Sequence, residues 1–460
     1  MKPALGIPVL MALISGSCGR DLSSRPVPGS DAPNVLIITL DTLRADVLGC
    51  YGDRDGVSPF LDEFAKSAVL FESATTAMAT TFPSHSTIFT GLYPRVHGVS
   101  WNGERLAPEF TTLAERLDGA GWDTGAFVSY KAMLTDGGLD QGYSVVSDRE
   151  RARGEHGIRS GRETYELAQG WLEEPRNGPF FAWVHFFDTH TPLPTRPWSD
   201  ERMSDYAGVF RDGASNEELV ALNRAARLGD GSMPPADMAA FRLLYKAAVL
   251  EVDELVGKTV AAAERASGAR PLIVILVADH GEMTGDHGMF GHGYVLWEGV
   301  LHVPLLIRAT GRFEPARVSR RVGLVDLAPT LLELLELPAE PGSPGHSLLP
   351  LLRGEIVPDE IYFSEVRATR KDAPARTESL AGFFGSFKVL LDGDKAHWFD
   401  LSSSLNEANA MSLDQAPEPI RQTLARMQEF LLKASSGSDA SRGQLNPEQR
   451  AELAALGYTE

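Results

Sequence analysis

The chain has 460 residues, of which 43% are hydrophobic and 23% are charged, so it is long enough and apolar enough to bury a large core. Its formal charge is −19, from 43 Lys and Arg against 62 Asp and Glu. An acidic surface repels the phosphate backbone, which argues against nucleic acid as a partner.

The N-terminal segment has the pattern of an export signal. An apolar run at 5–14, LGIPVLMALI, lies behind Lys2 and is followed by small residues and Cys18. This run is too short to cross a bilayer but suits a signal peptide, and its ending resembles a bacterial lipoprotein signal. We therefore expect a signal peptide at 1–18 and a polar linker at 19–33. The expected protein is exported, either periplasmic or held at the membrane by a lipid on Cys18.

Apolar runs and helical spacing alternate along the next part of the chain. Continuous apolar runs predict buried strands at 34–40, 124–129, 180–186 and 271–279. Helical spacing is found at 61–71, at 112–121 and at 238–266, where one face of the longest predicted helix carries Phe241, Leu244, Tyr245, Ala248, Val252 and Leu255. Strands alternating with helices predict an α/β domain with a largely parallel sheet.

The character of the sequence changes in two later places. Residues 199–236 are polar and lack strong periodicity, which predicts an insertion over the sheet edge that could serve as a substrate lid. Residues 387–401 predict a hairpin around a DGDK turn, and 418–433 predict a helix. We assign 341–433 to a smaller C-terminal subdomain and 434–460 to a linker with a helical tail.

Acidic residues follow three of the predicted buried strands. Asp41, Asp188 and Asp279 each come at a strand end, and the last two have His190 and His280 close by. Ligands of open α/β sheets gather at the carboxyl ends of the strands. A single Asp after a strand is more often a turn or cap residue. Three such acids, two with an imidazole nearby, instead suit a divalent cation.

Thr81 lies where a helix is predicted to begin. Pro83 favours the first helical turn, and the helical pattern continues to Gly91. A hydroxyl at this point faces unpaired N–H groups and the positive end of the helix dipole, which favour a bound anion. Taken alone, Thr81 could simply be an N-cap. Beside a divalent ion, its hydroxyl could ionise and attack phosphorus or sulfur.

Six segments of the chain together resemble the sulfatases of the alkaline phosphatase superfamily. They are NVLIITLDTLRADVLGCYG (34–52), TTFPSHSTIFTGLYPRVHGV (80–99), HFFDTHTP (185–192), ADHGEMTGDHGMFGHG (278–293), VPLLIR (303–308) and VDLAPTLLELLEL (325–337). The resemblance implies an alkaline-phosphatase-like α/β/α sandwich with a large mixed, mainly parallel sheet and a smaller C-terminal α+β subdomain. It places the catalytic domain at 34–340.

The resemblance also implies roles for individual residues. Asp41, Asp279 and His280 match the family's metal ligands, and Thr81 matches the nucleophile, which would also touch the metal. His190 matches a histidine that contacts the sulfuryl or phosphoryl group, and His292 falls where sulfatases commonly carry a sulfate-contacting lysine. The cofactor is a divalent metal ion, and the sequence leaves Ca, Mn, Zn and Mg all open.

Several positions depart from the sulfatase pattern. The C/S-x-P-x-R motif that matures to formylglycine reads TFPSH here, with Thr81 for the Cys and His85 for the Arg. Thr42 replaces the second Asp of the family's pair, and Lys131 is at best a partial substitute for a missing GKWHLG segment. TFPSH instead resembles the TFPNH of nucleotide pyrophosphatase/phosphodiesterases, whose nucleophile is the threonine.

Residues around these positions allow further roles. In the phosphodiesterase branch, a histidine near His292 can bind a second metal, which Asp188 could join. Glu282 could order His280 or cap a turn, and Arg44 with Asp46 predicts an ion pair that braces the loop after the first strand.

The sequence therefore predicts a metal-dependent hydrolase of sulfuric or phosphoric esters. Because the nucleophile is a threonine, we expect a small-molecule or glycan phosphate ester as substrate in preference to a sulfate ester. Two alternatives stay open: a membrane-anchored phosphoryl-group transferase, and a degenerate sulfatase that binds an anion or glycan without catalysis. The leaving group, the metal and the oligomeric state are left undetermined.

Overall fold

The computed structural model describes residues 28–29, 31–147, 158–190, 235–368, 377–393, 395–402, 407 and 409–434. The predicted signal peptide, the insertion at 199–236 and the C-terminal tail lie outside the described residues, apart from residues 235–236 and 434. Among the described helices, none combines the length and apolar character needed to cross a bilayer.

A large mixed sheet forms the centre of the fold, with the strand order β10-β2-β9-β6-β1-β5-β3-β4. Its strands are β1 (Asn34–Leu40), β2 (Val69–Thr75), β3 (Asp123–Val128), β4 (Val145–Val146), β5 (Phe180–Phe186), β6 (Leu272–Ala278), β9 (His302–Ala309) and β10 (Ala316–Gly323). Strand β9 runs antiparallel to both of its neighbours, and the other pairs are parallel. Every residue of β1, β5 and β6 is buried, as their continuous apolar runs predict.

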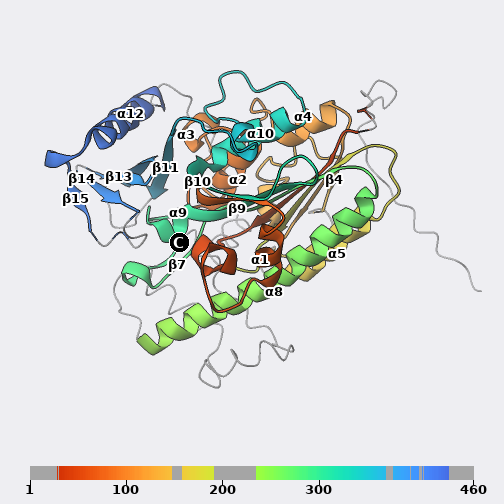
Figure 1. The fold of residues 1–460 in the computed structure, drawn as a ribbon, viewed down its shortest axis with the longest axis horizontal. Helices are drawn as coiled ribbons and strands as arrows, with labels where there is room; N and C mark the ends of the chain where they lie inside the picture. Colours follow the sequence, from red (N-terminus) through yellow and green to blue (C-terminus); the bar gives the residue numbers. More distant parts are fainter. Residues whose placement is uncertain are drawn as a thin grey trace, which may run out of the picture.

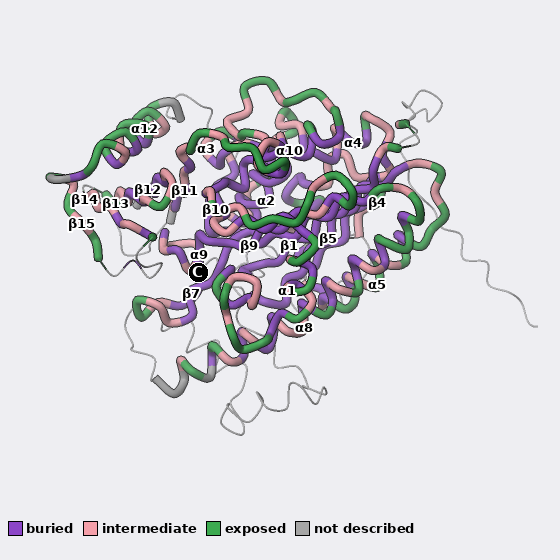
Figure 2. Tube along the Cα trace, viewed as in Figure 1, coloured by how far each residue is buried: buried purple, intermediate pink, exposed green. Residues whose placement is uncertain are grey.

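Helices cover both faces of this sheet (Figure 1). One layer contains α1 (Pro59–Ala65), α5 (Gly161–Leu172) and α8 (Pro235–Ser267); the other contains α2 (Thr81–Thr90), α3 (Pro94–His97), α4 (Leu113–Gly119) and α10 (Leu327–Leu334). The predicted apolar face of α8 is buried, and the outward sides of α5 and α8 are exposed (Figure 2). The predicted α/β/α sandwich with a mainly parallel sheet is confirmed.

Short elements complete this part of the chain. They are α9 (Glu298–Leu301), α11 (Leu349–Leu352), the two-stranded β7 (Met283–Thr284) and β8 (Phe290–Gly291), and 3-10 helices at Ala45–Val47, Gly49–Tyr51, Lys131–Met133, Asp286–Gly288, Leu324–Asp326 and Leu413–Gln415.

The helical prediction for residues 61–71 is only half right. Helix α1 ends at Ala65, and Val69, Leu70 and Phe71 open strand β2. Beyond the end of α1, the apolar residues keep a helical spacing although they do not lie in a helix. Strand β2 lies between β9 and β10 and bonds to both, and this pairing with distant segments overrides the local pattern.

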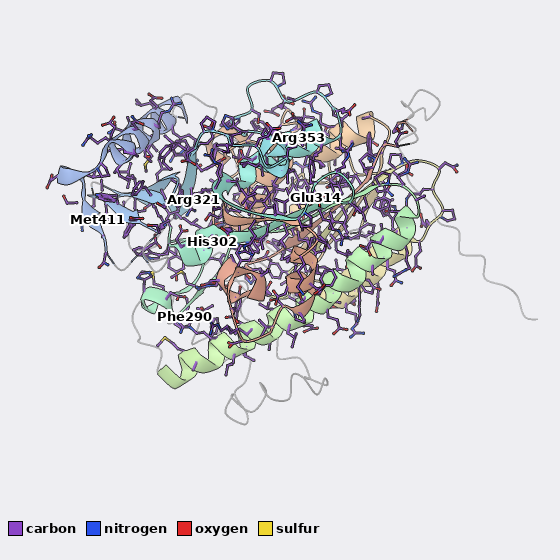
Figure 3. The ribbon with its side chains drawn as sticks, viewed as in Figure 1. Phe290, His302, Glu314, Arg321, Arg353 and Met411 are labelled. Carbon is purple, nitrogen blue, oxygen red and sulfur yellow. The ribbon has the colours of Figure 1, made fainter. Side chains whose placement is uncertain are left out.

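The C-terminal part forms a second, antiparallel sheet of β11 (Ile361–Ala368), β12 (Thr377–Phe384), β13 (Phe387–Asp392), β14 (Lys395–Asp400) and β15 (Met411–Ser412). Strands β13 and β14 form the predicted hairpin, and α12 (Glu418–Ala434) packs on β12 and β13. The smaller α+β subdomain is thereby confirmed, while its boundary at residue 341 stays a prediction. Arg321 marks the end of β10 that faces this sheet (Figure 3).

Candidate active site

The predicted site residues meet at the carboxyl ends of the central strands. Asp41 follows β1 and Asp279 follows β6, and these parallel strands are paired up to Leu40 and Ala278. The start of α2 lies against the same edge, because the Ser84 hydroxyl donates a hydrogen bond to the Asp279 carbonyl at 2.7 Å. The fold therefore brings Thr81 to the two carboxylates.

Asp41, Asp279 and His280 form a group suited to a metal ion. Their ligand atoms lie within 4.8 Å of one another, and no other such group of His, Cys, Asp or Glu occurs among the described residues. All three side chains are buried, and both carboxylate oxygens of Asp41 and Oδ2 of Asp279 accept no hydrogen bond in the described part of the chain. Buried carboxylates without donors are costly, so this cradle fits a divalent cation.

The electrostatics of this cradle lead to the same conclusion. Burial, and then the charge of Glu282, raise the pKa of Asp41 well above its usual value, although the Thr81 hydroxyl beside it opposes the rise. Burial, and then the charge of Asp41, raise the pKa of Asp279 in the same way. A positive charge bound between the two carboxyl groups would offset these effects and favour the ionised forms.

The hydrogen bonds of His280 leave one ring nitrogen ready to bind a metal. Its Nδ1 lies 2.9 Å from the carbonyl oxygen of Gly281, which can only accept, so Nδ1 carries the proton. Burial, and then His292, hold the pKa of His280 well below its usual value, so the ring is neutral. Its bare Nε2 lies 3.5 Å from Oδ2 of Asp279. This is the form in which imidazole binds a cation.

Thr81 is the first residue of α2 and does not cap it. Thr80 occupies the N-cap position, and its side chain makes no capping hydrogen bond. The Thr81 hydroxyl lies 3.4 Å from Nε2 of His280, in a fully buried position. The N-cap alternative for Thr81 is therefore wrong, and its hydroxyl lies beside the cradle formed by Asp41, Asp279 and His280.

The start of α2 offers fewer amide donors than its sequence suggests. The Phe82 N–H donates to Oδ1 of Asn102 at 2.8 Å, Pro83 has no N–H, and the Ser84 N–H donates to Thr80. The amide N–H groups that we expected to be free for an anion at this helix start are thus mostly hydrogen-bonded already. The Nδ2 group of the same Asn102 side chain is buried and makes no hydrogen bond to the described residues. Nothing in the sequence around Asn102 indicates its contact with the start of α2.

Both predicted catalytic histidines lie beside the cradle. The ring centroids of His190 and His292 are 4.9 Å apart, and those of His280 and His292 are 4.5 Å apart. Nδ1 of His292 lies 3.1 Å from Oε1 of Glu282, with both side chains fully buried. Glu282 therefore orients His292, and His292 turns its Nε2 away from this carboxylate.

Asp188 does not join the metal cradle. Its Oδ1 accepts a hydrogen bond from the Gly161 N–H at 3.0 Å, at the start of α5. No second group of metal ligands is found in the described ranges. The second metal that the sequence allowed stays a prediction. The Lys131 side chain lies outside the described part of the chain.

Arg44 links the loops that follow β1 and β6. It forms the predicted ion pair with Asp46, through hydrogen bonds of 2.7 and 2.8 Å. It also donates to the Glu282 carbonyl at 3.0 Å and to Asp286 at 2.6 Å. Thr42, in the loop after β1, has a φ of +53°, which is strained for a β-branched residue. Arg44 thus holds together the two segments that carry the site.

Beneath the cradle lies a polar chain whose roles were missed from the sequence. Thr39 is paired with His185 across β1 and β5, inside two otherwise apolar strands. The Thr39 hydroxyl contacts His85 and His185, each at 3.0 Å. His85 lies 3.5 Å from Asp279, and His185 lies 3.5 Å from Asp41. The signal that could have revealed them is a polar residue at a fully buried strand position.

Comparison with known proteins identifies a sulfatase family model and several sulfatases of similar sequence. The sequence model of a family described as Sulfatase matches residues 33–337. Steryl-sulfatase of Mus musculus is 27% identical over 444 residues, covering 77% of this chain and 71% of that protein. Arylsulfatase of Clostridium perfringens is 23% identical, covering 84% of this chain and 89% of its own length. Arylsulfatase K of Gallus gallus is 24% identical and covers 73% and 69%.

Solved structures share the fold. A phosphonate monoester hydrolase of Agrobacterium radiobacter superposes with a TM-score of 0.69 at 23% identity, covering 89% of this chain and 97% of its own. BT4656, solved with its substrate D-glucosamine-2-N,6-O-disulfate, gives a TM-score of 0.67 at 18% identity, covering 90% and 100%. At these identities the likeness concerns the architecture, and it matches the two-sheet arrangement described above.

Proposed function

This chain belongs to the sulfatase family, and from that premise we propose that it is a metal-dependent hydrolase of sulfuric or phosphoric esters with Thr81 as its nucleophile. One observation carries the proposal. The Thr81 hydroxyl lies 3.4 Å from the bare Nε2 of His280, beside carboxylate oxygens that no donor satisfies. A buried hydroxyl in that position has little other use.

Asp41, Asp279 and His280 would hold the divalent cation, with the Thr81 hydroxyl next to it. The unsatisfied carboxylate oxygens and the bare imidazole nitrogen fit such an ion, whether Ca, Mn, Zn or Mg. When bound, the cation would lower the pKa of a neighbouring hydroxyl and polarise an ester oxygen.

Thr81 then forms a bond from Oγ1 to phosphorus or sulfur while the bond to the leaving oxygen breaks on the opposite side. His190 and His292 stabilise the developing charge or deliver a proton to the leaving oxygen, and Glu282 holds the His292 ring for this task. The Nδ2 group of Asn102 offers a further donor to a substrate oxygen. Water finally attacks the phosphorus or sulfur of the covalent intermediate, breaks its bond to Oγ1 of Thr81 and releases sulfate, phosphate or, from a diester, a phosphate monoester.

Threonine favours phosphoryl over sulfuryl transfer. It cannot form the aldehyde hydrate with which formylglycine expels sulfate, so the intermediate has to be hydrolysed by water. The likeness of TFPSH to TFPNH supports a phosphate mono- or diester, and the shared fold of a phosphonate monoester hydrolase is compatible with it. The substrate is a small-molecule or glycan ester, met outside the cytoplasm if residues 1–18 direct export. The family match favours hydrolysis over the transferase and the inactive binding protein.

The test compares ester classes and variants. Purified protein with Mn²⁺, Zn²⁺, Ca²⁺ or Mg²⁺ is assayed against 4-nitrophenyl sulfate, 4-nitrophenyl phosphate, bis(4-nitrophenyl) phosphate and a phosphonate monoester. We expect Thr81→Ala to lower kcat by about a thousandfold or more, because no other group can form the covalent intermediate. Thr90→Ala is the matched control, since it removes a buried hydroxyl of the same helix that donates to the Ser86 carbonyl and accepts from the Leu92 N–H.

Each result has a distinct meaning. Acid quenching during turnover of a phosphate ester should trap a phosphoryl group on the Thr81 peptide, detectable by mass spectrometry. Full activity of Thr81→Ala would refute the assigned nucleophile. Turnover of the sulfate ester alone would refute the phosphoryl preference. A modified acceptor without released phosphate would identify a transferase, and a metal-free protein inactive on every ester would identify a binding protein.

A further inference from the structure

The Thr39 hydroxyl is a junction in the buried chain beneath the cradle. It lies in β1, where every residue is buried, and no atom of it reaches solvent. Three side chains converge on its oxygen: Trp183 Nε1 at 2.9 Å, His85 Nε2 at 3.0 Å and His185 Nδ1 at 3.0 Å. A hydroxyl donates one hydrogen bond and accepts two, so these neighbours use its full capacity.

What each partner can do limits the directions of these hydrogen bonds. The indole N–H of Trp183 can only donate. Nδ1 of His85 lies 2.7 Å from the Thr81 carbonyl, which can only accept, so Nδ1 carries a proton. The Thr39 hydroxyl therefore accepts from Trp183, donates to one of the two histidines and accepts from the other. In both arrangements it holds the Nε2 end of the His85 ring.

This chain connects the nucleophile to both carboxylates. His85 Nδ1 holds the Thr81 carbonyl and lies 3.5 Å from Oδ2 of Asp279. His185 extends the chain on the other side, with its Nε2 3.5 Å from Oδ2 of Asp41. The His85 ring itself is held at its Nε2 end by Thr39 alone among the described hydrogen bonds.

We infer that Thr39 is a positioning residue: its hydroxyl holds the orientation of the His85 ring, and His85 in turn fixes the main chain of Thr81 against the cradle. This inference rests on the proposed function, because it assigns Thr39 a role in aligning the Thr81 nucleophile. His85 stands where sulfatases carry an arginine, and a hydrogen bond at its Nε2 keeps its Nδ1 aimed at the Thr81 carbonyl.

The first test separates positioning from packing. Thr39→Val keeps the side-chain shape and removes the hydroxyl, and Thr39→Ser keeps the hydroxyl. We expect Thr39→Val to lower kcat about 10- to 100-fold with KM changed less than about threefold, because a misaligned nucleophile slows the chemical step and leaves the binding groups in place. Thr39→Ser should stay within about threefold of the wild-type kcat. Thr259→Val, which removes a buried hydroxyl that donates to the Leu255 carbonyl in α8, is the control.

The second test needs no activity. In metal-free protein with ¹⁵N-labelled histidine, the His85 resonances, assigned by their loss in His85→Asn, should show a protonated Nδ1, as its hydrogen bond to the Thr81 carbonyl requires. In Thr39→Val we expect the Nδ1 resonance to shift, because the ring is no longer held at Nε2 and its hydrogen bond to Thr81 weakens, whereas Thr39→Ser should leave this resonance in place. An unchanged Nδ1 resonance in Thr39→Val, or a kcat within twofold of wild type, would overturn the inference. A wild-type protein with the expected Nδ1 resonance that hydrolyses no ester would instead overturn the proposed function, and the catalytic role of Thr39 with it.

Discussion

Asp41→Asn should stabilise the metal-free protein while it destroys metal binding. The Asp41 carboxylate is fully buried, and neither of its oxygens accepts a hydrogen bond from the described residues. Glu282 and Asp279 add like charge near it. A neutral amide of the same shape removes the charge that the cradle cannot satisfy without a cation. Stability and function therefore oppose each other at this position.

The magnitude follows from the two ways in which the fold can accommodate the carboxyl group. It either stays ionised without donors or takes up a proton, and protonating a group of ordinary pKa 3.8 at about pH 7.5 costs at most about 5 kcal/mol. The asparagine variant still buries an amide without hydrogen-bond partners, which costs about 1–3 kcal/mol of stability. We therefore expect a net gain of about 2 kcal/mol, which raises Tm by roughly 2 °C for a domain of about 400 residues.

The pH dependence has a definite sign. Because the folded-state pKa of Asp41 is raised, the stability that its protonated form contributes at low pH is lost as the pH rises above the unfolded-state pKa of 3.8. The advantage of Asp41→Asn should thus grow with pH. Saturating metal should reverse the order, since an ion at about 1,000 times its Kd adds about 4 kcal/mol to the wild type alone.

The assay is calorimetric unfolding of chelator-treated protein at several pH values, with and without added Mn²⁺. Asp326→Asn is the matched control. Its carboxylate is equally buried, but Oδ1 accepts from the His346 N–H at 2.7 Å and Oδ2 from the Gly323 N–H at 3.0 Å. An amide can satisfy only one of these donors, so this variant should lose stability. A metal-free Asp41→Asn protein less stable than the wild type would refute the reasoning.

Two further predictions concern stability away from the cradle. Lys388 is fully buried and pairs with Glu407 and Glu298, so Lys388→Met should lower the free energy of unfolding by about 3–5 kcal/mol, measured in urea, because it leaves the buried Glu407 carboxylate without a cation, while Glu298 keeps Arg321; recovery in the double variant with Glu407→Gln checks this cause, and an unchanged urea midpoint would contradict it. Burial raises the pKa of Asp253 to about 6, so its stabilising contribution should be lost as pH rises from about 4 to 6. That slope in the urea midpoint should flatten in Asp253→Asn, and an equal slope in both proteins would contradict the assignment.

Local sequence patterns predicted the secondary structure correctly where a segment is buried over its whole length or along one face. The apolar runs at β1, β5 and β6, the helix from Thr81 to Gly91 and the long apolar face of α8 were all predicted correctly. Strand β2 was not, because its apolar residues continue the spacing of α1 and only its pairing with β9 and β10 makes it a strand. The amides at the start of α2 were likewise misjudged, since Asn102 reaches them from outside the helix.

The sequence by itself determined the chemical inventory: the acids at the strand ends, the threonine before Pro83 and the order of the family motifs. Only the tertiary structure decided which donors each of these groups meets. In the folded chain the Asp41 oxygens accept no hydrogen bond from the described residues, the Glu282 carboxylate contacts His292, and the Thr39 hydroxyl contacts His85 and His185. The physical reason is that residue type fixes what a group can donate or accept, whereas hydrogen bonds between residues far apart in the chain exist only once the strands are paired.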